Sequence, residues 1–407
     1  MDPATQPVPT AEAIVREAAA LRGKNAWEEI AKFAGHIPTN FDRSWLAAAD
    51  HVVFALGQLG RTGPAVTLGE RAFTLEPTHR RASALAYLHY DALLRHKVRK
   101  PRLDDPEPYR KAFEHWIGEA LRLRPESLVD HYRLGVYLAQ IQTQKDVKAL
   151  QAFSETLRLW ARIPEAERTV RHPHFKIRIK ALYAAARSAF RLGRMKEAWR
   201  FVCRCIKEDE ERDHVAPVYK YFLAAKILHA QGRHADAERG LRKALEARHD
   251  GPRDFVHALL AEVALAQGRP DDAVQWIELN VRPHHRKPYI WRLLGDAEAK
   301  RGKPDRALSH YRSALIKDHG GRHLTLLQMG RLHEARGNLR EARRAYEQAA
   351  DFKRRRYHVE DPGALRALAK VCEELHDIQA ARSALRRMAE LPLCRAEAVA
   401  ELERLAG

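Results

Sequence analysis

Cysteine is scarce in this sequence, and the spacing of the few cysteines excludes two kinds of site. The four are Cys203, Cys205, Cys372 and Cys394, with no CxxC pair and no regular ladder of spacings among them. Disulfide-rich extracellular domains and cysteine-based zinc sites both need such patterns. A reducing compartment is therefore favoured, and we expect a cytoplasmic protein.

Long hydrophobic runs are also missing. No stretch approaches the roughly 18 apolar residues that a transmembrane helix requires, so no transmembrane segment is expected. The first residues, MDPATQPVPTAEA, contain neither the basic region nor the apolar region of a secretory signal.

The common catalytic and cofactor motifs are absent as well. The sequence has no GxxxxGK(S/T), GxGxxG, GxSxG or HExxH pattern. His333 and Glu334 begin a zinc motif that lacks its second histidine, and His284 and His285 have no neighbouring cysteine or carboxylate to complete a tetrahedral site. We therefore expect no enzymatic activity, no cofactor and no metal site.

Negative charge is outnumbered. The chain has 72 Lys and Arg against 53 Asp and Glu, which gives a net charge of +19, with 45% hydrophobic and 31% charged residues. This composition suits thin layers of amphipathic helices with a large wetted surface. The positive field favours nucleic acid, an anionic membrane or an acidic protein surface as a partner.

The most informative feature is a repeat, in which a glycine is followed five residues later by an alanine. The pairs are Gly60/Ala65, Gly193/Ala198, Gly232/Ala237, Gly268/Ala273, Gly302/Ala307 and Gly337/Ala342. The last five glycines lie 39, 36, 34 and 35 residues apart. Glycine ends a helix by taking the left-handed conformation, and alanine lets the next helix approach closely. The pattern predicts a series of helical hairpins.

In its period and its residues, the repeat resembles the tetratricopeptide repeat family, in particular the cytosolic bacterial type. The signature spacing is matched by Trp291, Leu294, Gly295, Gly302, Ala307, Tyr311 and Ala314, and next best by Met329, Gly330, Gly337, Ala342, Tyr346 and Ala349. The resemblance implies an all-α, right-handed superhelical solenoid of about nine helix pairs with terminal capping helices. We expect the first pair to begin near Trp45, the last near Pro362, and a final helix over 395–405.

Four segments are expected along the chain. Residues 1–44 form N-terminal helices and a cap, and residues 45–174 form divergent repeats with inserts. Residues 175–351 contain the well-matched repeats, and residues 352–407 contain the last helix pair and a capping helix.

The connections between successive repeats are rich in cations and histidine. Because equivalent connections of a solenoid align, they predict a basic edge formed by Arg80, Arg81, Arg171, Lys176, Arg282, Arg286, Lys287, Arg322, Lys353, Arg354, Arg355 and Arg356. This edge is either a surface for an anionic partner or ordinary solvated loop, since cations near a helix C-terminus also favour the helix dipole.

The resemblance also implies a concave groove lined by the first helix of each pair. The family's groove positions fall on Lys180, Tyr183, Arg187, Arg191, Tyr219, Phe222, Lys226, His229, Tyr289, Arg292 and Arg331. Aromatic rings beside cations suit an acidic or aromatic peptide. Packing between repeats is the alternative role for Tyr183, Tyr219 and Phe222. The paired asparagines of the family's carboxylate-clamp members are missing.

The leading hypothesis is a scaffold or adaptor that holds a peptide segment or an acidic protein partner in this groove, with the basic edge facing anionic partners. A helical-repeat protein that binds RNA is one alternative. An assembly factor in peripheral contact with an anionic membrane is another.

Overall fold

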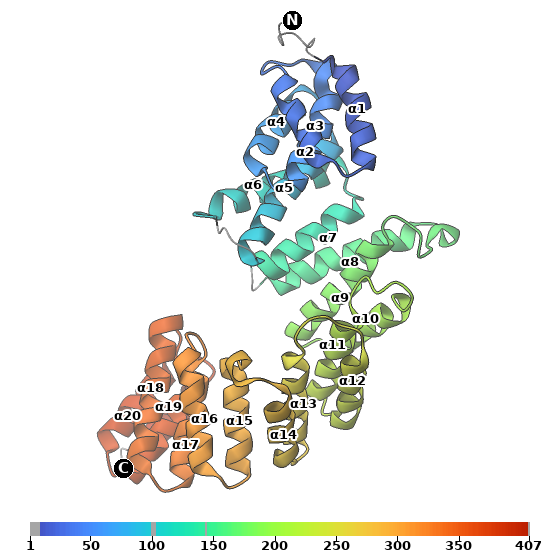
Figure 1. Ribbon diagram of the computed structural model, residues 1–407. Helices are drawn as coiled ribbons and strands as arrows, with labels where there is room; N and C mark the ends of the chain where they lie inside the picture. Colours follow the sequence, from blue (N-terminus) through green and yellow to red (C-terminus); the bar gives the residue numbers. More distant parts are fainter. Residues whose placement is uncertain (1–8, 99–102, 143–144, 406–407) are drawn as a thin grey trace, which may run out of the picture. The chain divides into compact units, whose positions relative to one another are not determined.

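The computed structural model describes residues 9–98, 103–142 and 145–405, and every regular element in these ranges is helical. The chain divides at the Ala216–Pro217 junction into two compact units. This junction lies inside the segment 175–351 that the sequence grouped together. We call the residues before it unit 1 and those after it unit 2 (Figure 1).

Unit 1 begins with two N-terminal helices and continues with four helix pairs. The first helices are α1 (Ala11–Gly23) and α2 (Trp27–Lys32), followed by the short turns η1 (Phe33–His36) and η2 (Arg43–Trp45). The pairs are α3 (Leu46–Gln58) with α4 (Thr62–Leu75), α5 (His79–Val98) with α6 (Glu107–Leu123), α7 (Leu128–Val136) with α8 (Asp146–Arg162), and α9 (Phe175–Arg191) with α10 (Met195–Glu208). The π-helical turn η3 (Tyr137–Ile141) extends α7, and η4 (Glu165–Glu167) follows α8.

Unit 2 contains five helix pairs and a last single helix. The pairs are α11 (Pro217–Ala230) with α12 (His234–Glu246), α13 (Asp254–Ala266) with α14 (Pro270–Asn280), α15 (Pro288–Lys300) with α16 (Pro304–Lys317), α17 (Arg322–Ala335) with α18 (Leu339–Tyr357), and α19 (Pro362–Glu374) with α20 (Ile378–Ala389). The turn η5 (Pro283–His285) precedes α15, and α21 (Arg395–Arg404) ends the unit. The prediction of an all-α chain of nine helix pairs is thus confirmed for the described residues.

The repeated glycines end the first helix of their pairs as expected. All six have a positive φ of 72–76°. At Gly302, for example, the glycine N–H donates to the Ala299 carbonyl at 3.1 Å and the next N–H donates to the Glu298 carbonyl at 2.9 Å. These two bonds satisfy carbonyls that the helix end leaves open. The alanine that follows each glycine is fully buried, as at Ala307.

The last pair makes the same turn without glycine. His376 lies at the equivalent position with φ 59°, and Ala381, five residues on, is fully buried. The His376 N–H donates to the Glu373 carbonyl at 2.9 Å, as the glycines do. A left-handed histidine is sterically unfavourable, so the packing of α19 on α20 holds a conformation that the local sequence resists.

A second glycine in the two best-matched repeats makes room for an aromatic ring. A Cβ added at Gly295 would lie 2.3 Å from the Tyr311 ring, and one at Gly330 would lie 2.4 Å from the Tyr346 ring. The Tyr311 hydroxyl donates to Asp296 at 2.7 Å, on the helix that faces the predicted groove. The core contact therefore also positions a charged groove residue.

Candidate partner-binding surfaces

The predicted groove residues are divided between the two units. Those of unit 1 all lie on α9, and they are Lys180, Tyr183, Arg187 and Arg191. Those of unit 2 lie on the first helices α11, α15 and α17, and they are Tyr219, Phe222, Lys226, His229, Tyr289, Arg292 and Arg331. Each set is described within its own unit.

On α9, some of the predicted groove residues already contact other side chains of unit 1. The Arg191 Nε donates to Asp146 of α8 at 2.8 Å. The Arg187 guanidinium lies over the Tyr183 ring, 5.9 Å from its centroid. Burial, together with the charge of Lys176, lowers the pKa of Lys180. Arg191 therefore ties α9 to α8, and Arg187 is an exposed cation of this face that is not used in this contact.

An aromatic cluster lies where α11 meets α13 in unit 2. The Tyr219 and Phe255 rings are stacked, with centroids 5.8 Å apart and an angle of 17° between their planes. Phe222 packs edge-on against Phe255 at 4.8 Å. The cluster is only half closed, because Tyr219 is 40% exposed. Phe255 was not predicted, although it follows the first residue of its helix as Tyr289 does in α15, and that register could have revealed it.

Carboxylates and cations alternate along the neighbouring first helices. Burial raises the pKa of Glu262, and the charges of Lys226 and Arg292 oppose that rise only in part. Burial likewise raises the pKa of Asp296, against the Tyr311 hydrogen bond and the charges of Arg292, Lys300 and Arg331. For both carboxylates, the effect of burial thus exceeds the stabilisation of the charged form by neighbouring cations and hydrogen bonds. Each carboxylate can accept further hydrogen bonds.

Several charged side chains of the first helices of unit 2 are already paired within the chain. The Lys370 Nζ lies 2.7 Å from Glu334, which also accepts a 2.7 Å hydrogen bond from Tyr346. Arg366 pairs with Glu397 of α21 at 2.5 Å. The Lys300 Nζ donates to the Leu265 carbonyl at 3.1 Å. Arg331 remains exposed to solvent beside these pairs.

Two residues of the predicted basic edge are buried. Arg81 is 8% exposed and donates to Asp50 at 3.0 Å and Glu76 at 2.7 Å. Arg286 is 7% exposed, donates to the Val281 carbonyl at 3.0 Å and lies over the Trp291 ring. The expectation that both lie on an exposed edge is wrong, because Arg81 is paired with Asp50 of the preceding helix α3, and Arg286 packs on Trp291 of the following helix α15.

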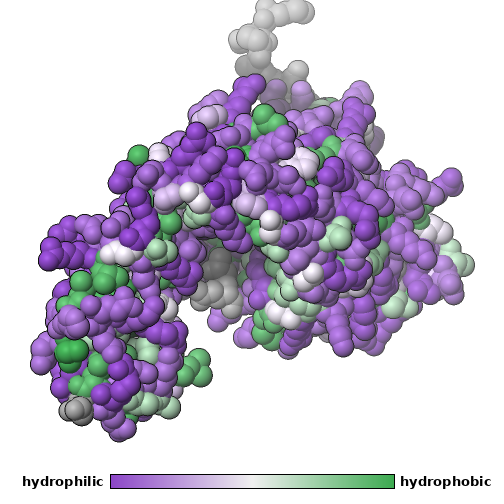
Figure 2. All heavy atoms as spheres, turned by 90° about the horizontal axis from the view of Figure 1, so that it is seen from below, coloured by the Kyte–Doolittle hydropathy of each residue, from purple (hydrophilic) through white to green (hydrophobic). Residues whose placement is uncertain are grey.

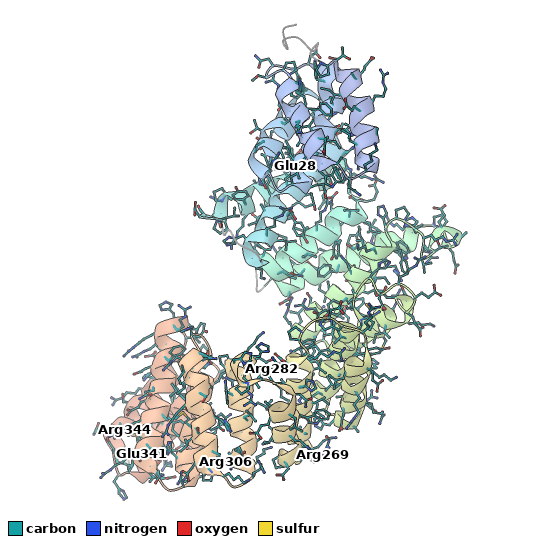
Figure 3. The ribbon with its side chains drawn as sticks, in the orientation of Figure 1. Glu28, Arg269, Arg282, Arg306, Glu341 and Arg344 are labelled. Carbon is teal, nitrogen blue, oxygen red and sulfur yellow. The ribbon has the colours of Figure 1, made fainter. Side chains whose placement is uncertain are left out.

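Two further edge residues are half-buried and bonded within the chain. Arg322 donates to the Leu315 carbonyl at 2.8 Å, and Lys353 lies 3.1 Å from Asp361. The exposed members of the edge are Arg80, Arg171, Lys176, Arg282, Lys287, Arg354, Arg355 and Arg356. In Figure 3, Arg282 lies on one edge of unit 2, and Arg269 and Arg306 lie on the opposite edge. Arg355 and Arg356 line a cavity of 530 Å³ together with Phe352.

Hydrophilic side chains cover most of the face in Figure 2, and hydrophobic ones form scattered patches. Among the described residues, no helix is long and apolar enough to cross a membrane. The same residues contain no group of three potential metal ligands.

Two family models match the chain. The model described as a tetratricopeptide repeat-like domain matches residues 181–334, and one described as a tetratricopeptide repeat matches residues 327–392. Together they span more than half of the sequence. The chain belongs to the tetratricopeptide repeat family. Proteins of this family generally act as scaffolds for protein interactions.

Solved structures of other proteins are similar to this chain. A tetratricopeptide repeat protein from Parabacteroides merdae has a TM-score of 0.52 at 15% identity, over 72% of this chain and 98% of that one. The C-terminal part of a repeat protein from Cytophaga hutchinsonii has a TM-score of 0.44 at 17% identity, over 67% and 99%. Yeast Tom70 has a TM-score of 0.44 at 15% identity, over 97% and 95%. No curated protein matches the sequence.

Proposed function

We propose that this tetratricopeptide repeat protein is a non-catalytic scaffold whose unit 2 binds an extended peptide segment of a protein partner along its first helices. The half-open cluster of Tyr219, Phe222 and Phe255 carries the proposal. An aromatic side chain that is 40% exposed and held in a stack loses little conformational entropy when a ligand ring or aliphatic side chain covers it.

The charges beside the cluster support a peptide with both polar and charged groups. The desolvated carboxylates of Glu262 and Asp296 can accept hydrogen bonds from peptide N–H groups. Arg292 and Arg331 offer donors to peptide carboxylates. A purely acidic ligand fits this mixed surface less well than the sequence suggested, because two carboxylates lie among the cations.

The exposed cations of the basic edge have a second role in the proposal. Arg282, Lys287, Arg355 and Arg356 raise the local concentration of acidic partners near unit 2 and speed their association. The reducing cytoplasm is the proposed compartment, and all four cysteines are free.

Selection from a random displayed-peptide library tests the groove. Peptides enriched by the wild-type protein should bind the double variant Tyr219→Ala/Phe255→Ala at least about tenfold more weakly. The matched control is Leu279→Ala/Ile316→Ala, which removes exposed apolar side chains from the second helices α14 and α16. Equal loss in both variants, or no enrichment at all, would refute the groove proposal.

RNA binding is the competing outcome. If single-stranded RNA is the ligand, affinity should fall with salt with a slope of about −0.7 per phosphate contacted. Reversal of Lys287 and Arg355 to glutamate should then make the slope shallower.

A further inference from the structure

Unit 1 contains a cavity of 510 Å³ at the ends of several helices, separate from the proposed groove. His79 contributes from the start of α5, and the connection between α6 and α7 contributes Arg124. Arg162 contributes from the end of α8, and His174 lies just before α9. Basic residues from three successive connections between helix pairs therefore line one cavity. The sequence of each connection taken alone does not show that they meet.

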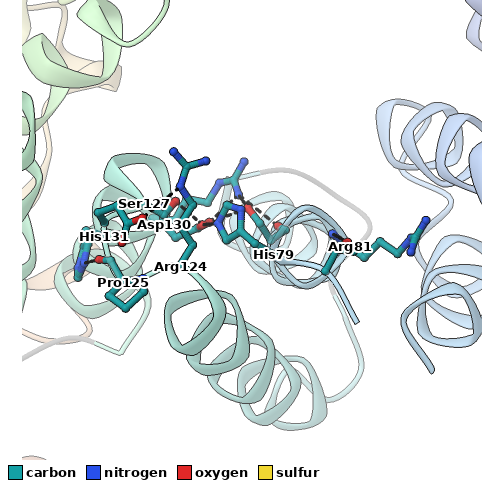
Figure 4. A network of polar contacts seen from close by, with 11 residues as sticks. His79, Arg81, Arg124, Pro125, Ser127, Asp130 and His131 are labelled. Atoms are coloured by element: carbon teal, nitrogen blue, oxygen red, sulfur yellow. Dashed lines mark hydrogen bonds and ion pairs between the residues drawn. The ribbon is translucent and has the colours of Figure 1, made fainter. Parts of the chain in front are cut away.

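A buried carboxylate, Asp130, holds one wall of this cavity (Figure 4). Its Oδ1 accepts hydrogen bonds from the Ser83 hydroxyl at 2.7 Å and from Arg133 at 3.1 Å. Its Oδ2 accepts from the Ser127 hydroxyl at 2.6 Å and lies 2.8 Å from the His79 Nε2. Two bonds to each oxygen fill the lone pairs of a carboxylate.

Burial raises the pKa of Asp130, but the hydrogen bonds from Ser127, Ser83 and His79 and the charge of Arg133 together hold it below its ordinary value. The carboxylate is therefore ionised and fully compensated. It fixes the His79 ring and both serine side chains, and it has no acceptor site left for a ligand.

The rest of the inner wall is apolar. Leu128 and Leu159 are buried residues at the back of the cavity, and Val129 and Ile163 are half-buried beside them. Such a surface stabilises an aliphatic or aromatic group by about 25 cal/mol for each Å² of apolar area that it covers. An inorganic anion could make no use of it.

The cations at the rim have only weak interactions with carboxylates of the protein. Glu126 is the carboxylate among the lining residues, and its oxygen lies 4.0 Å from the Arg124 Nε, beyond hydrogen-bond distance. Arg162 forms no hydrogen bond or ion pair with another described residue. Burial, with the charges of His172 and Arg124, lowers the pKa of His174. The two arginines therefore supply the positive charge of the rim.

Two neighbouring arginines show that this lack of pairing is local. Arg122, on α6, donates to Glu119 at 2.8 Å. Arg158, on α8, donates to Glu155 at 2.6 Å. Each is paired with a carboxylate three residues earlier on its own helix, whereas Arg124 and Arg162, further along, have none within hydrogen-bond distance.

We propose that this cavity binds an acidic segment of a protein partner that inserts one side chain of an apolar pair flanked by acidic residues. The apolar side chain would cover the wall of Leu128 and Leu159, and the flanking carboxylates would pair with Arg124 and Arg162. The proposal does not rest on the groove of unit 2, because every residue it uses lies in unit 1.

A fluorescein-labelled peptide, Ac-EELFEE-amide, is a direct probe, and its binding to the full chain is measured by fluorescence anisotropy. The variant Arg124→Gln/Arg162→Gln should bind it at least about tenfold more weakly. The control is Arg122→Gln/Arg158→Gln, which removes the same charge two and four positions earlier in the chain and should change the affinity less than about twofold. The Arg124 side chain makes only a long, exposed ion pair with Glu126, and Arg162 forms no hydrogen bond or ion pair with a described residue. The first variant should therefore keep its circular dichroism spectrum and melting temperature.

Two further peptides separate the parts of the claim. Ac-EESSEE-amide lacks the apolar pair, and Ac-KKLFKK-amide has the opposite charge. Both should bind at least about tenfold more weakly than the first peptide. Equal loss in the two arginine variants would show a general field effect and overturn the site. Binding of Ac-EESSEE-amide as strong as that of Ac-EELFEE-amide would overturn the role of the apolar wall, and so would full displacement by inorganic phosphate. No detectable binding of Ac-EELFEE-amide would overturn the proposal as a whole.

Discussion

His89 should make unit 1 sensitive to mild acid. It lies on α5 and is 7% exposed, and neither ring nitrogen has a hydrogen-bond partner among the described residues. Its ring packs edge-on against Tyr109 of α6, with centroids 5.9 Å apart. Burial lowers the pKa of His89 from 6.5 to about 4. The neutral ring is therefore the form that the fold accommodates.

The direction of the effect follows from proton uptake. The unfolded chain binds a proton at His89 below about pH 6.5, whereas the folded chain does so only near pH 4. Acidification between these values therefore favours the unfolded state. At about 1.4 kcal/mol for each pKa unit, the full difference would cost about 2 kcal/mol at pH 5. Partial solvation of the ring reduces this to about 1–2 kcal/mol.

Hydrogen exchange in α5 and α6 at pH 8 and pH 5 measures the local free energy of opening without assuming that the whole repeat array unfolds in one step. Values corrected for the intrinsic pH dependence of exchange should fall by about 1–2 kcal/mol in the wild type. His89→Phe should abolish this fall, and His115→Gln, at an exposed position on α6, should retain it. An equal loss in wild type and His89→Phe would refute the reasoning.

Three other substitutions test the repeat. His376→Gly should stabilise the last helix pair by about 0.5–1 kcal/mol, because glycine accepts the left-handed turn, and slower exchange in α20 would show it. Ala342→Leu should overpack the contact of α17 with α18 at a cost of about 1–3 kcal/mol, and an unchanged melting curve would mean that the helix register is wrong. Tyr311→Phe should cost about 1–3 kcal/mol, because the desolvated Asp296 loses a donor, and urea titration would measure it.

The helix pairs could be predicted from the sequence because their signals are local. A glycine that ends one helix and an alanine that starts the next lie five residues apart, and neither needs a distant partner to have its effect. The predicted starts near Trp45 and Pro362 agree with α3 at Leu46 and α19 at Pro362. The last pair has no glycine in its turn. It was found from its remaining pattern, and its left-handed His376 was not foreseen.

The binding surfaces depended on contacts between repeats, which the sequence shows poorly. Arg81 and Arg286 follow the same basic sequence pattern as exposed cations, yet Arg81 is buried against α3 and Arg286 against α15. Phe255 completes an aromatic cluster with residues of another pair, and its own repeat gives no sign of that neighbour. The cavity of unit 1 needs residues from three connections, and one of them, between α6 and α7, was not grouped with the basic edge.

The sequence by itself determined the fold class, the repeat family and the number of helix pairs, since each follows from residues within one repeat. Only the tertiary structure decided which side chains of those repeats stay exposed. Burial and ion pairing depend on how each connection packs against the next helix, and identical residue types met different neighbours there. Arg122 and Arg124 illustrate this, because one pairs with a carboxylate on its own helix and the other reaches the rim of a cavity.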